Sequence, residues 1–154
     1  MPSTSNYEVR GATPADAQAI ANIHRAEGVA YWREAIEFCE PQVLVAVHGA
    51  DVVGFVGFDR SRDAGTPPET GEIWAIYVVA GHCGMGAGLA LWDAAREGLI
   101  EEGCTTVTVW LPLANERAIR FHELAGFKRE MKSIKTVVRR GHRAEEIRLK
   151  RTLE

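Results

Sequence analysis

The chain has 154 residues, of which 46% are hydrophobic and 25% charged, and its formal net charge is −3. These values are typical of one globular domain and exclude a largely disordered chain or a collagen-like one. No apolar run reaches the about 18 residues of a transmembrane helix, and residues 1–10 show no secretory signal. We therefore expect a single domain over residues 1–154, located in the cytoplasm.

The cysteines and the charges exclude other classes. Cys39, Cys83 and Cys104 form no C-x-x-C pattern, so the sequence predicts neither a zinc site nor a disulfide framework. Residues 1–127 carry 17 acidic and 8 basic residues, whereas residues 128–154 carry 4 and 10. Apolar residues interrupt the basic stretch, which favours solvated strands that protect a sheet edge over a nucleic-acid binder.

The residue pattern of the N-terminal half predicts five elements. In chain order they are a strand at 7–10, helices at 13–27 and 32–39, and strands at 43–47 and 52–58. Thr13 and Pro14 are typical of a helix start, and Gly28 ends that helix. A short turn around Gly49 joins the last two strands into a hairpin.

The C-terminal half predicts six more elements, in chain order a strand at 72–79, a helix at 89–102, a strand at 105–111, a helix at 115–125, and strands at 127–137 and 145–152. Gly103 and Gly126 end the two helices. The order β-α-α-β-β-β-α-β-α-β-β predicts an α/β (α+β) fold. We expect a single mixed, mostly antiparallel sheet of about seven strands, flanked by about four helices.

A glycine-rich loop separates the strand at 72–79 from the following helix. Gly84, Gly86 and Gly88 permit positive φ angles and a close approach of a ligand to the backbone. The first amides of a helix are unpaired and attract an anion such as pyrophosphate. A tight turn that only packs helix on strand fits the spacing equally well. The P-loop pattern is absent, and a Rossmann loop matches poorly.

Two segments resemble the signatures of the GNAT-type N-acetyltransferases. Residues 77–91 read YVVAGHCGMGAGLAL and resemble the family's acetyl-CoA motif, [RQ]-x-x-G-x-[GA] after a strand that ends in valine. Residues 115–127 read NERAIRFHELAGF and resemble its second signature, N-x-x-A-x-x-F-Y-x-x-x-G-F. The element order also matches, so the resemblance covers nearly the whole chain. It implies the GNAT fold and acetyl transfer from acetyl-CoA to an amine by direct attack in a ternary complex, without a metal.

The resemblance also implies which residues hold acetyl-CoA. They belong to the strand end, the glycine loop and the second signature: Ile76, Tyr77, Val78, Val79, Cys83, Gly84, Met85, Gly86, Ala87, Gly88, Leu89, Asn115 and Phe121. A backbone N–H near Val78 or Val79 is the expected donor to the oxyanion. Asn115 meets the CoA arm, caps its helix, or does both. Cys83 replaces the usual Arg or Gln, so we expect weakened binding of acetyl-CoA rather than its loss.

Two residues are candidates for the proton transfers. Glu72 is the candidate base, six residues before Val78 and on the same strand face by alternation, or else an exposed strand-end carboxylate. His122 stands where the family carries the tyrosine that protonates the departing CoA thiolate. It is either the acid or a buried histidine bonded to a carbonyl. His24 and His82 carry no distinct signal, and we interpret them as structural.

The acceptor is the least defined partner. The resemblance implies that the segments 24–40 and 136–144 bind it, as a small-molecule amine or a protein amine, at an N-terminus or a lysine. Trp110 stands where ribosomal-protein acetylases carry a base glutamate, which disfavours that class. A catalytically silent CoA-binding module is the alternative function, motivated by Cys83 and His122. We expect no nucleic acid and no membrane as partner, and a homodimer formed through the C-terminal half.

Overall fold

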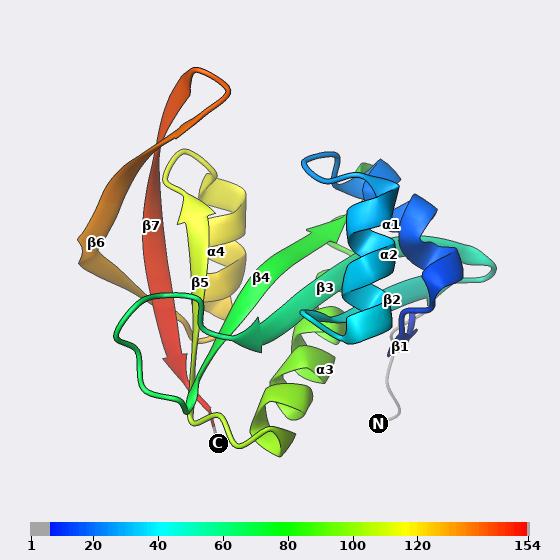
Figure 1. Cartoon of the computed structure of the whole chain (residues 1–154), viewed down its shortest axis with the longest axis horizontal. Helices are drawn as coiled ribbons and strands as arrows, with labels where there is room; N and C mark the ends of the chain where they lie inside the picture. Colours follow the sequence, from blue (N-terminus) through cyan, green and yellow to red (C-terminus); the bar gives the residue numbers. More distant parts are fainter. Residues whose placement is uncertain (1–6, 154) are drawn as a thin grey trace. The chain divides into compact units, whose positions relative to one another are not determined.

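A computed structural model describes residues 7–153 (Figure 1). The elements are β1 (Glu8–Gly11), the 3₁₀ helix η1 (Pro14–Asp16), α1 (Ala17–Ile23), α2 (Val29–Phe38), β2 (Gln42–His48), β3 (Asp51–Arg60), β4 (Thr70–Val78), the 3₁₀ helix η2 (Ala80–His82), α3 (Ala87–Glu101), β5 (Thr106–Pro112), α4 (Glu116–Leu124), β6 (Lys128–Arg139) and β7 (His142–Thr152). The strands form one seven-stranded mixed sheet in the order β1-β2-β3-β4-β5-β7-β6. The predicted element order and fold class are therefore confirmed.

The described residues divide into two compact units. The first unit holds residues 7–59 and 73–102, and the second holds residues 60–72 and 103–153. The division runs through β4, between Glu72 and Ile73. Within residues 7–153, no helix is both long enough and apolar enough to cross a membrane.

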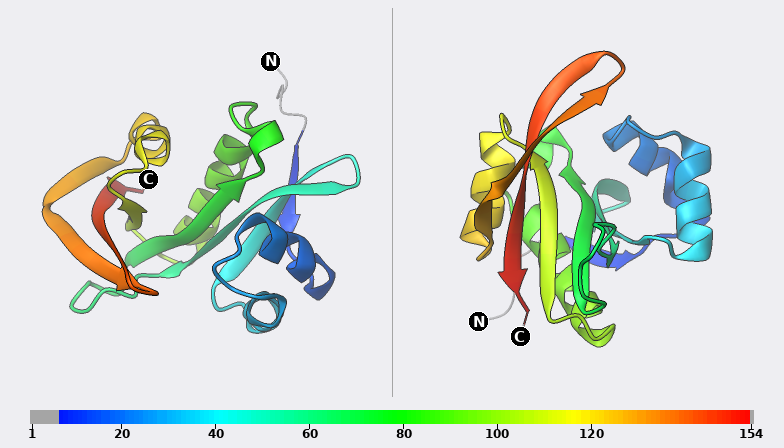
Figure 2. Two further views of the ribbon diagram at one scale, coloured as in Figure 1. Left: turned by 90° about the horizontal axis from the view of Figure 1, so that it is seen from above. Right: turned by 60° about the vertical axis from the view of Figure 1, so that its left-hand side comes forward.

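The first unit has helices on both faces of its strands. Phe55 of β3 packs edge-on against Trp32 of α2, with ring centroids 5.0 Å apart. Phe58, three residues further along β3, packs against α3, where a Cβ added at Gly98 would lie 2.7 Å from its ring. Side chains an odd number of residues apart point to opposite faces of a strand. The pair α1 and α2 therefore covers one face and α3 the other, as the left view of Figure 2 shows.

The first helix ends earlier than the sequence predicts. Helical spacing indicated a helix over 13–27, but α1 ends at Ile23 and His24 is extended, with φ −125° and ψ 100°. The His24 ring is stacked on Tyr77 of β4, with centroids 4.1 Å apart and an interplanar angle of 14°. Since this partner lies far away in sequence, local helical spacing overestimated the length of the helix.

The second unit is built around the antiparallel strands β5, β7 and β6. Leu149 of β7 lies opposite Val109 of β5 and Arg129 of β6. The long β6–β7 hairpin, orange and red in Figure 1, turns at Arg140 and Gly141, which both have positive φ. Two consecutive positive φ angles are typical of a type I′ turn, whose twist matches that of the strands.

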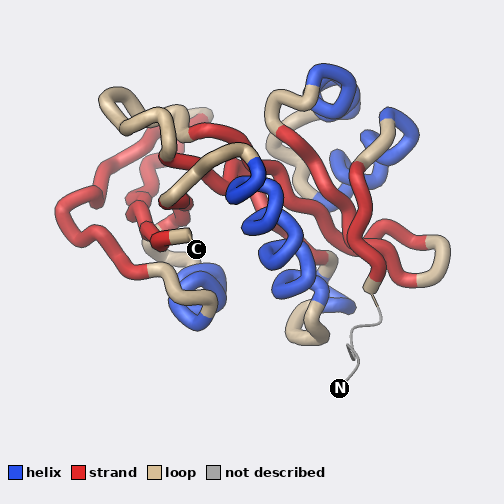
Figure 3. The backbone as a smooth tube through the Cα atoms, turned by 90° about the horizontal axis from the view of Figure 1, so that it is seen from below, coloured by secondary structure: helices blue, strands red, loops and turns tan. Residues whose placement is uncertain are grey.

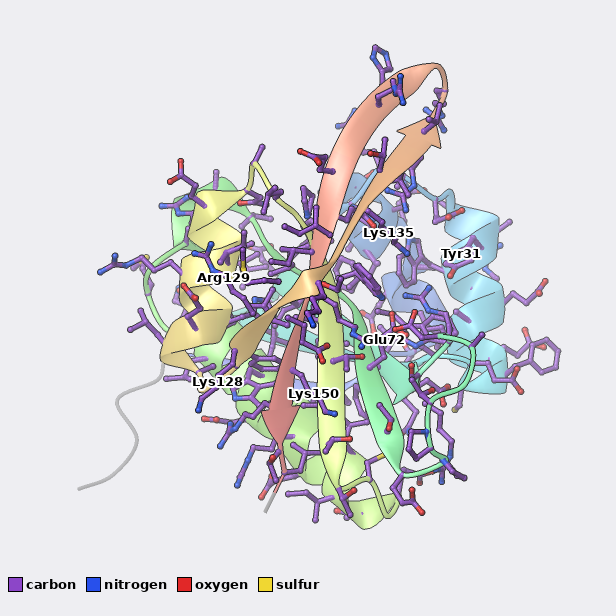
Figure 4. The ribbon with its side chains drawn as sticks, turned by 90° about the vertical axis from the view of Figure 1, so that its left-hand side faces the viewer. Tyr31, Glu72, Lys128, Arg129, Lys135 and Lys150 are labelled. Atoms are coloured by element: carbon purple, nitrogen blue, oxygen red, sulfur yellow. The ribbon has the colours of Figure 1, made fainter. Side chains whose placement is uncertain are left out.

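β6 lies at one edge of the sheet, as the basic residues in this stretch predicted. The basic residues of this strand are exposed, among them Lys128, Arg129 and Lys135, which Figure 4 labels. A strand at a sheet edge has unpaired backbone groups, and charged side chains along it oppose pairing with another chain.

Candidate active site

The glycine loop has the conformation that an anion site needs. Gly84 and Gly86 have φ angles of 76° and 99°, and a Cβ added at either would meet no atom within 4 Å. Gly86 is the N-cap of α3, the long helix of Figure 3, and no side chain caps that helix end. The first amides of α3 therefore border open space beside glycines, which suits a phosphate group.

Three contacts within the first unit hold this loop. A 2.8 Å hydrogen bond joins the hydroxyl of Tyr7 to Nδ1 of His82. The thiol of Cys83 lies 3.6 and 3.5 Å from the carbonyl oxygens of Val78 and Val79. Cys83 is thus turned toward the end of β4, where it holds the start of the loop in place.

The end of β4 distinguishes between the two predicted oxyanion donors. The N–H of Val79 donates to the carbonyl of Val53 on β3 at 2.8 Å, so this amide is already bonded. Amide directions alternate along an extended strand, so the N–H groups of Val78 and Ile76 point away from β3. The N–H of Val79 is therefore not available as the oxyanion donor. The N–H of Val78 remains the predicted donor.

The remaining residues predicted to bind acetyl-CoA lie on α3 and α4. Met85 and Leu89 are exposed, whereas the side chain of Ala87 is fully buried and leaves only its backbone to a ligand. The Oδ1 atom of Asn115 accepts the N–H of Ala118 at 3.1 Å, which confirms its role as the cap of α4. Phe121 lies beside His122 on α4 and is half-buried.

Glu72 is neither open to water nor unpaired. It is 1% exposed. Its Oε1 accepts the backbone N–H of Arg62 at 2.9 Å, and its Oε2 accepts the Arg62 Nη2 at 2.6 Å. The carboxylate labelled in Figure 4 is thus engaged on both oxygens by one residue of the β3–β4 loop. Its burial and its ion pair with Arg62 both oppose the uptake of a proton from an amine.

A second group of charges in the second unit was not anticipated. The Nε1 atom of Trp110 lies 3.0 Å from both carboxylate oxygens of Asp63, and Arg148 bonds the same carboxylate at 3.0 Å. The ammonium of Lys135 lies 3.9 Å above the Trp110 ring. The 61–70 segment carried no sequence signal beyond its loop composition, because its partners come from strands far along the chain.

His122 has the geometry of a buried histidine bonded to a carbonyl. It is 2% exposed, and its Nδ1–H donates to the carbonyl of Ala118 at 2.8 Å. The neutral ring then carries no proton on Nε2. Burial lowers the pKa of His122 because it disfavours the imidazolium, and the Ala118 carbonyl only partly opposes this. These observations limit proton donation by His122, although its role as the acid is still a testable prediction.

The lowered pKa of His122 makes the stability depend on pH. Below its ordinary value of 6.5, the unfolded chain binds a proton that the folded ring resists. The stabilisation is therefore complete above pH 6.5 and is lost as pH falls from there toward the lowered pKa. The loss is at most about 1.4 kcal/mol per pH unit. Urea unfolding at pH 7.5 and 5.5 measures it.

The variant His122→Phe should reduce this pH dependence, because it removes the titrating group from the same buried position. His142→Phe is the matched control, since His142 is an exposed residue of β7. Equal pH dependence in the wild type and in His122→Phe would contradict the prediction.

Comparison with known proteins relates this geometry to a family. Among residues 7–153, no group of three or more His, Cys, Asp or Glu residues could hold a metal ion. A mycothiol acetyltransferase of Kocuria rhizophila is 31% identical over 101 residues, which are 63% of this chain and 33% of that protein. The chain thus spans a third of that relative's length.

Solved structures share the fold. An N-acetyltransferase from Staphylococcus aureus Mu50 superposes with a TM-score of 0.81 and 21% identity, over 97% of this chain and 100% of that one. The protein yncA of Salmonella typhimurium, solved with its cofactor acetyl-CoA, gives 0.80 and 22% over 97% and 95%. The model of the acetyltransferase (GNAT) family matches residues 13–127 and so includes residues of both units. The chain therefore belongs to the acetyltransferase (GNAT) family.

Proposed function

We propose that this protein transfers an acetyl group from acetyl-CoA to a primary amine by direct attack in a ternary complex. One observation carries the proposal. In a chain of this family, Gly84 and Gly86 have positive φ and leave the start of α3 open. The presence of acetyl-CoA in a solved structure of the same fold supports the choice of donor.

The residues of the first unit suit the binding of acetyl-CoA, the acetyl donor. The amides at the start of α3 would bind the pyrophosphate, since a helix N-terminus favours negative charge. The N–H of Val78, which points away from β3, would stabilise the negative charge that develops on the acetyl oxygen. Acetyl-CoA supplies an activated acetyl group, and the chain supplies binding, orientation and a route for protons.

A catalytically silent CoA-binding module is the second candidate. Two observations favour it. The carboxylate of Glu72 is paired with Arg62, and the buried ring of His122 is bonded to the carbonyl of Ala118, so both residues predicted to transfer protons already have partners. A screen of small amines, amino acids and peptides, with detection of free CoA thiol, separates the two functions. Steady thiol release that depends on one amine supports transfer. Binding of acetyl-CoA without thiol release for any amine supports the silent module.

Acetyl-CoA is expected to raise the melting temperature. At a concentration of about 100 times Kd it stabilises the native state by about 2.7 kcal/mol, which corresponds to roughly 5–11 °C. Gly86→Val should abolish this shift, because the new side chain enters the open space above the loop. Differential scanning fluorimetry with and without acetyl-CoA measures it.

Gly103→Val is the matched control. Gly103 also has a positive φ, 86°, and open space around its Cβ position, so both variants carry similar backbone strain. Only Gly86→Val should lose the response to acetyl-CoA. A folded Gly86→Val protein with a normal shift would place the acetyl-CoA site elsewhere.

A further inference from the structure

His24 occupies a distinctive position in the first unit. It follows the last residue of α1, and its backbone N–H donates to the carbonyl of Ile20 at 2.9 Å. Its ring stacks on Tyr77, and the buried Phe55 lies behind, with centroids 6.3 Å apart. The ring orientation is therefore fixed by two aromatic neighbours from β3 and β4.

The imidazole nitrogens of His24 have no hydrogen-bond partner in the part of the chain that the structure describes. No hydrogen bond joins either nitrogen to any residue between 7 and 153, although the side chain is partly exposed. His82 and His122 differ, since the Nδ1 of His82 is bonded to Tyr7 and that of His122 to Ala118. His24 thus has a lone pair available to a ligand that reaches β4 from this side.

The contact with Tyr77 places His24 near the end of β4, where acetyl transfer is proposed to occur. Tyr77 directly precedes Val78, whose N–H is the proposed donor to the acetyl oxygen. The ring of His24, stacked on Tyr77, is therefore one residue along the strand from the Val78 N–H. Tyr77 is 42% exposed, so a ligand can reach this position. Among residues 7–153, the titratable groups that act on the ring are Tyr77 of β4, which stacks on it, and Glu27, whose charge raises its pKa.

We propose that His24 is the base that takes the proton from the acceptor's ammonium group, a role that rests on the proposed acetyl transfer. One ammonium proton passes to an imidazole nitrogen. The amine nitrogen then bonds to the acetyl carbon while the carbon–sulfur bond breaks. A second proton from the nitrogen goes to the departing sulfur, which gives the N-acetyl amine and the CoA thiol. The imidazolium returns its proton to water.

The electrostatics of the site agree with this role. Burial against the aromatic rings lowers the pKa of His24, and the negative charge of Glu27 opposes this only in part. The lowered pKa favours the neutral ring, which is the form that can accept a proton. Glu72, the base predicted from sequence, is buried, and both of its carboxylate oxygens are bonded to Arg62.

The test compares kcat/KM between pH 6 and 10 in the wild type, His24→Phe, His24→Gln and Glu72→Gln. His24→Phe keeps a ring that can stack on Tyr77 and removes both nitrogens. We expect kcat/KM at pH 7 to fall by about 10²-fold or more in both His24 variants. The deficit should shrink as pH rises and the free amine becomes common. In a third variant, His24→Ala, added imidazole should restore part of the lost rate.

The controls separate this inference from the proposed function. Arg129→Ala, a change at an exposed residue of β6, should keep the wild-type rate. The acetyl-CoA melting shift shows that each variant folds and binds the donor. An active wild type with unchanged rates in His24→Phe and His24→Gln, or with the pH-dependent deficit in Glu72→Gln alone, overturns the role of His24. A wild type that releases no thiol with any amine overturns the proposed function and this role with it.

Discussion

Replacing Arg62 by alanine is expected to lower the free energy of unfolding by about 3 kcal/mol. The change leaves the carboxylate of Glu72, which is 1% exposed, without the cation that pairs with it. Removing one partner of a buried ion pair typically costs about 3–5 kcal/mol, because the other charge stays buried without compensation. The lower end applies here, since the Arg62 side chain is 51% exposed and water can partly replace it. Urea unfolding at pH 7 measures the change.

A second substitution identifies the cause. In the Arg62→Ala background, Glu72→Gln should recover much of the stability, because a neutral amide needs no counter-ion. Arg129→Ala is the control. It removes an arginine from a pair with Glu123 in which both side chains are exposed, and exposed pairs contribute little. If Arg62→Ala and Arg129→Ala had equal effects, Glu72 would be solvated and the Arg62–Glu72 contact would not stabilise the fold.

Gly54→Ala is expected to destabilise the first unit by about 1–3 kcal/mol. The new Cβ would lie 2.8 Å from the carbonyl oxygen of Tyr77 and 3.2 Å from side-chain carbons of Leu91 and Val78. A backbone oxygen cannot move without displacing the end of β4. The clash outweighs the about 0.4–1 kcal/mol that Gly→Ala gains through the unfolded chain. Thermal unfolding should show a melting temperature lower by roughly 2–12 °C.

Gly11→Ala supplies the comparison for this change. Gly11 also lies in a strand, and a Cβ there would meet no atom within 4 Å. It should be neutral or slightly stabilising. Because Tyr77 and Val78 belong to the proposed acetyl-CoA site, Gly54→Ala should also weaken the acetyl-CoA melting shift. If the Gly54→Ala protein were as stable as the Gly11→Ala protein, β3 and β4 could move apart at this position without a loss of stability.

The sequence predicted those features that depend on neighbouring residues. The glycine loop before α3 and the asparagine cap of α4 are local, so residue type and spacing were sufficient to find them. Local runs of apolar and β-branched residues, with turn residues between them, located the strands for the same reason.

Features that depend on distant partners were not predictable. The end of α1 depends on a ring on β4, and the state of Glu72 depends on which of the 18 lysine and arginine residues reaches it. The family pattern therefore indicated a base at Glu72, whereas only the structure shows that Arg62 occupies this carboxylate. His24 carried no sequence signal, because its position is defined by Tyr77 and Phe55 rather than by its neighbours in the chain.

The strand order of the second unit has a consequence for folding during synthesis. β7 is the last strand in sequence, yet it lies between β5 and β6. A growing chain forms its N-terminal elements first, so β6 leaves the ribosome before the strand that pairs with it exists. Until β7 arrives, both edges of β6 are unpaired and open to other nascent chains. The lysines and arginines along β6 therefore act at the stage when aggregation is the greatest hazard, as gatekeepers of an unfinished sheet.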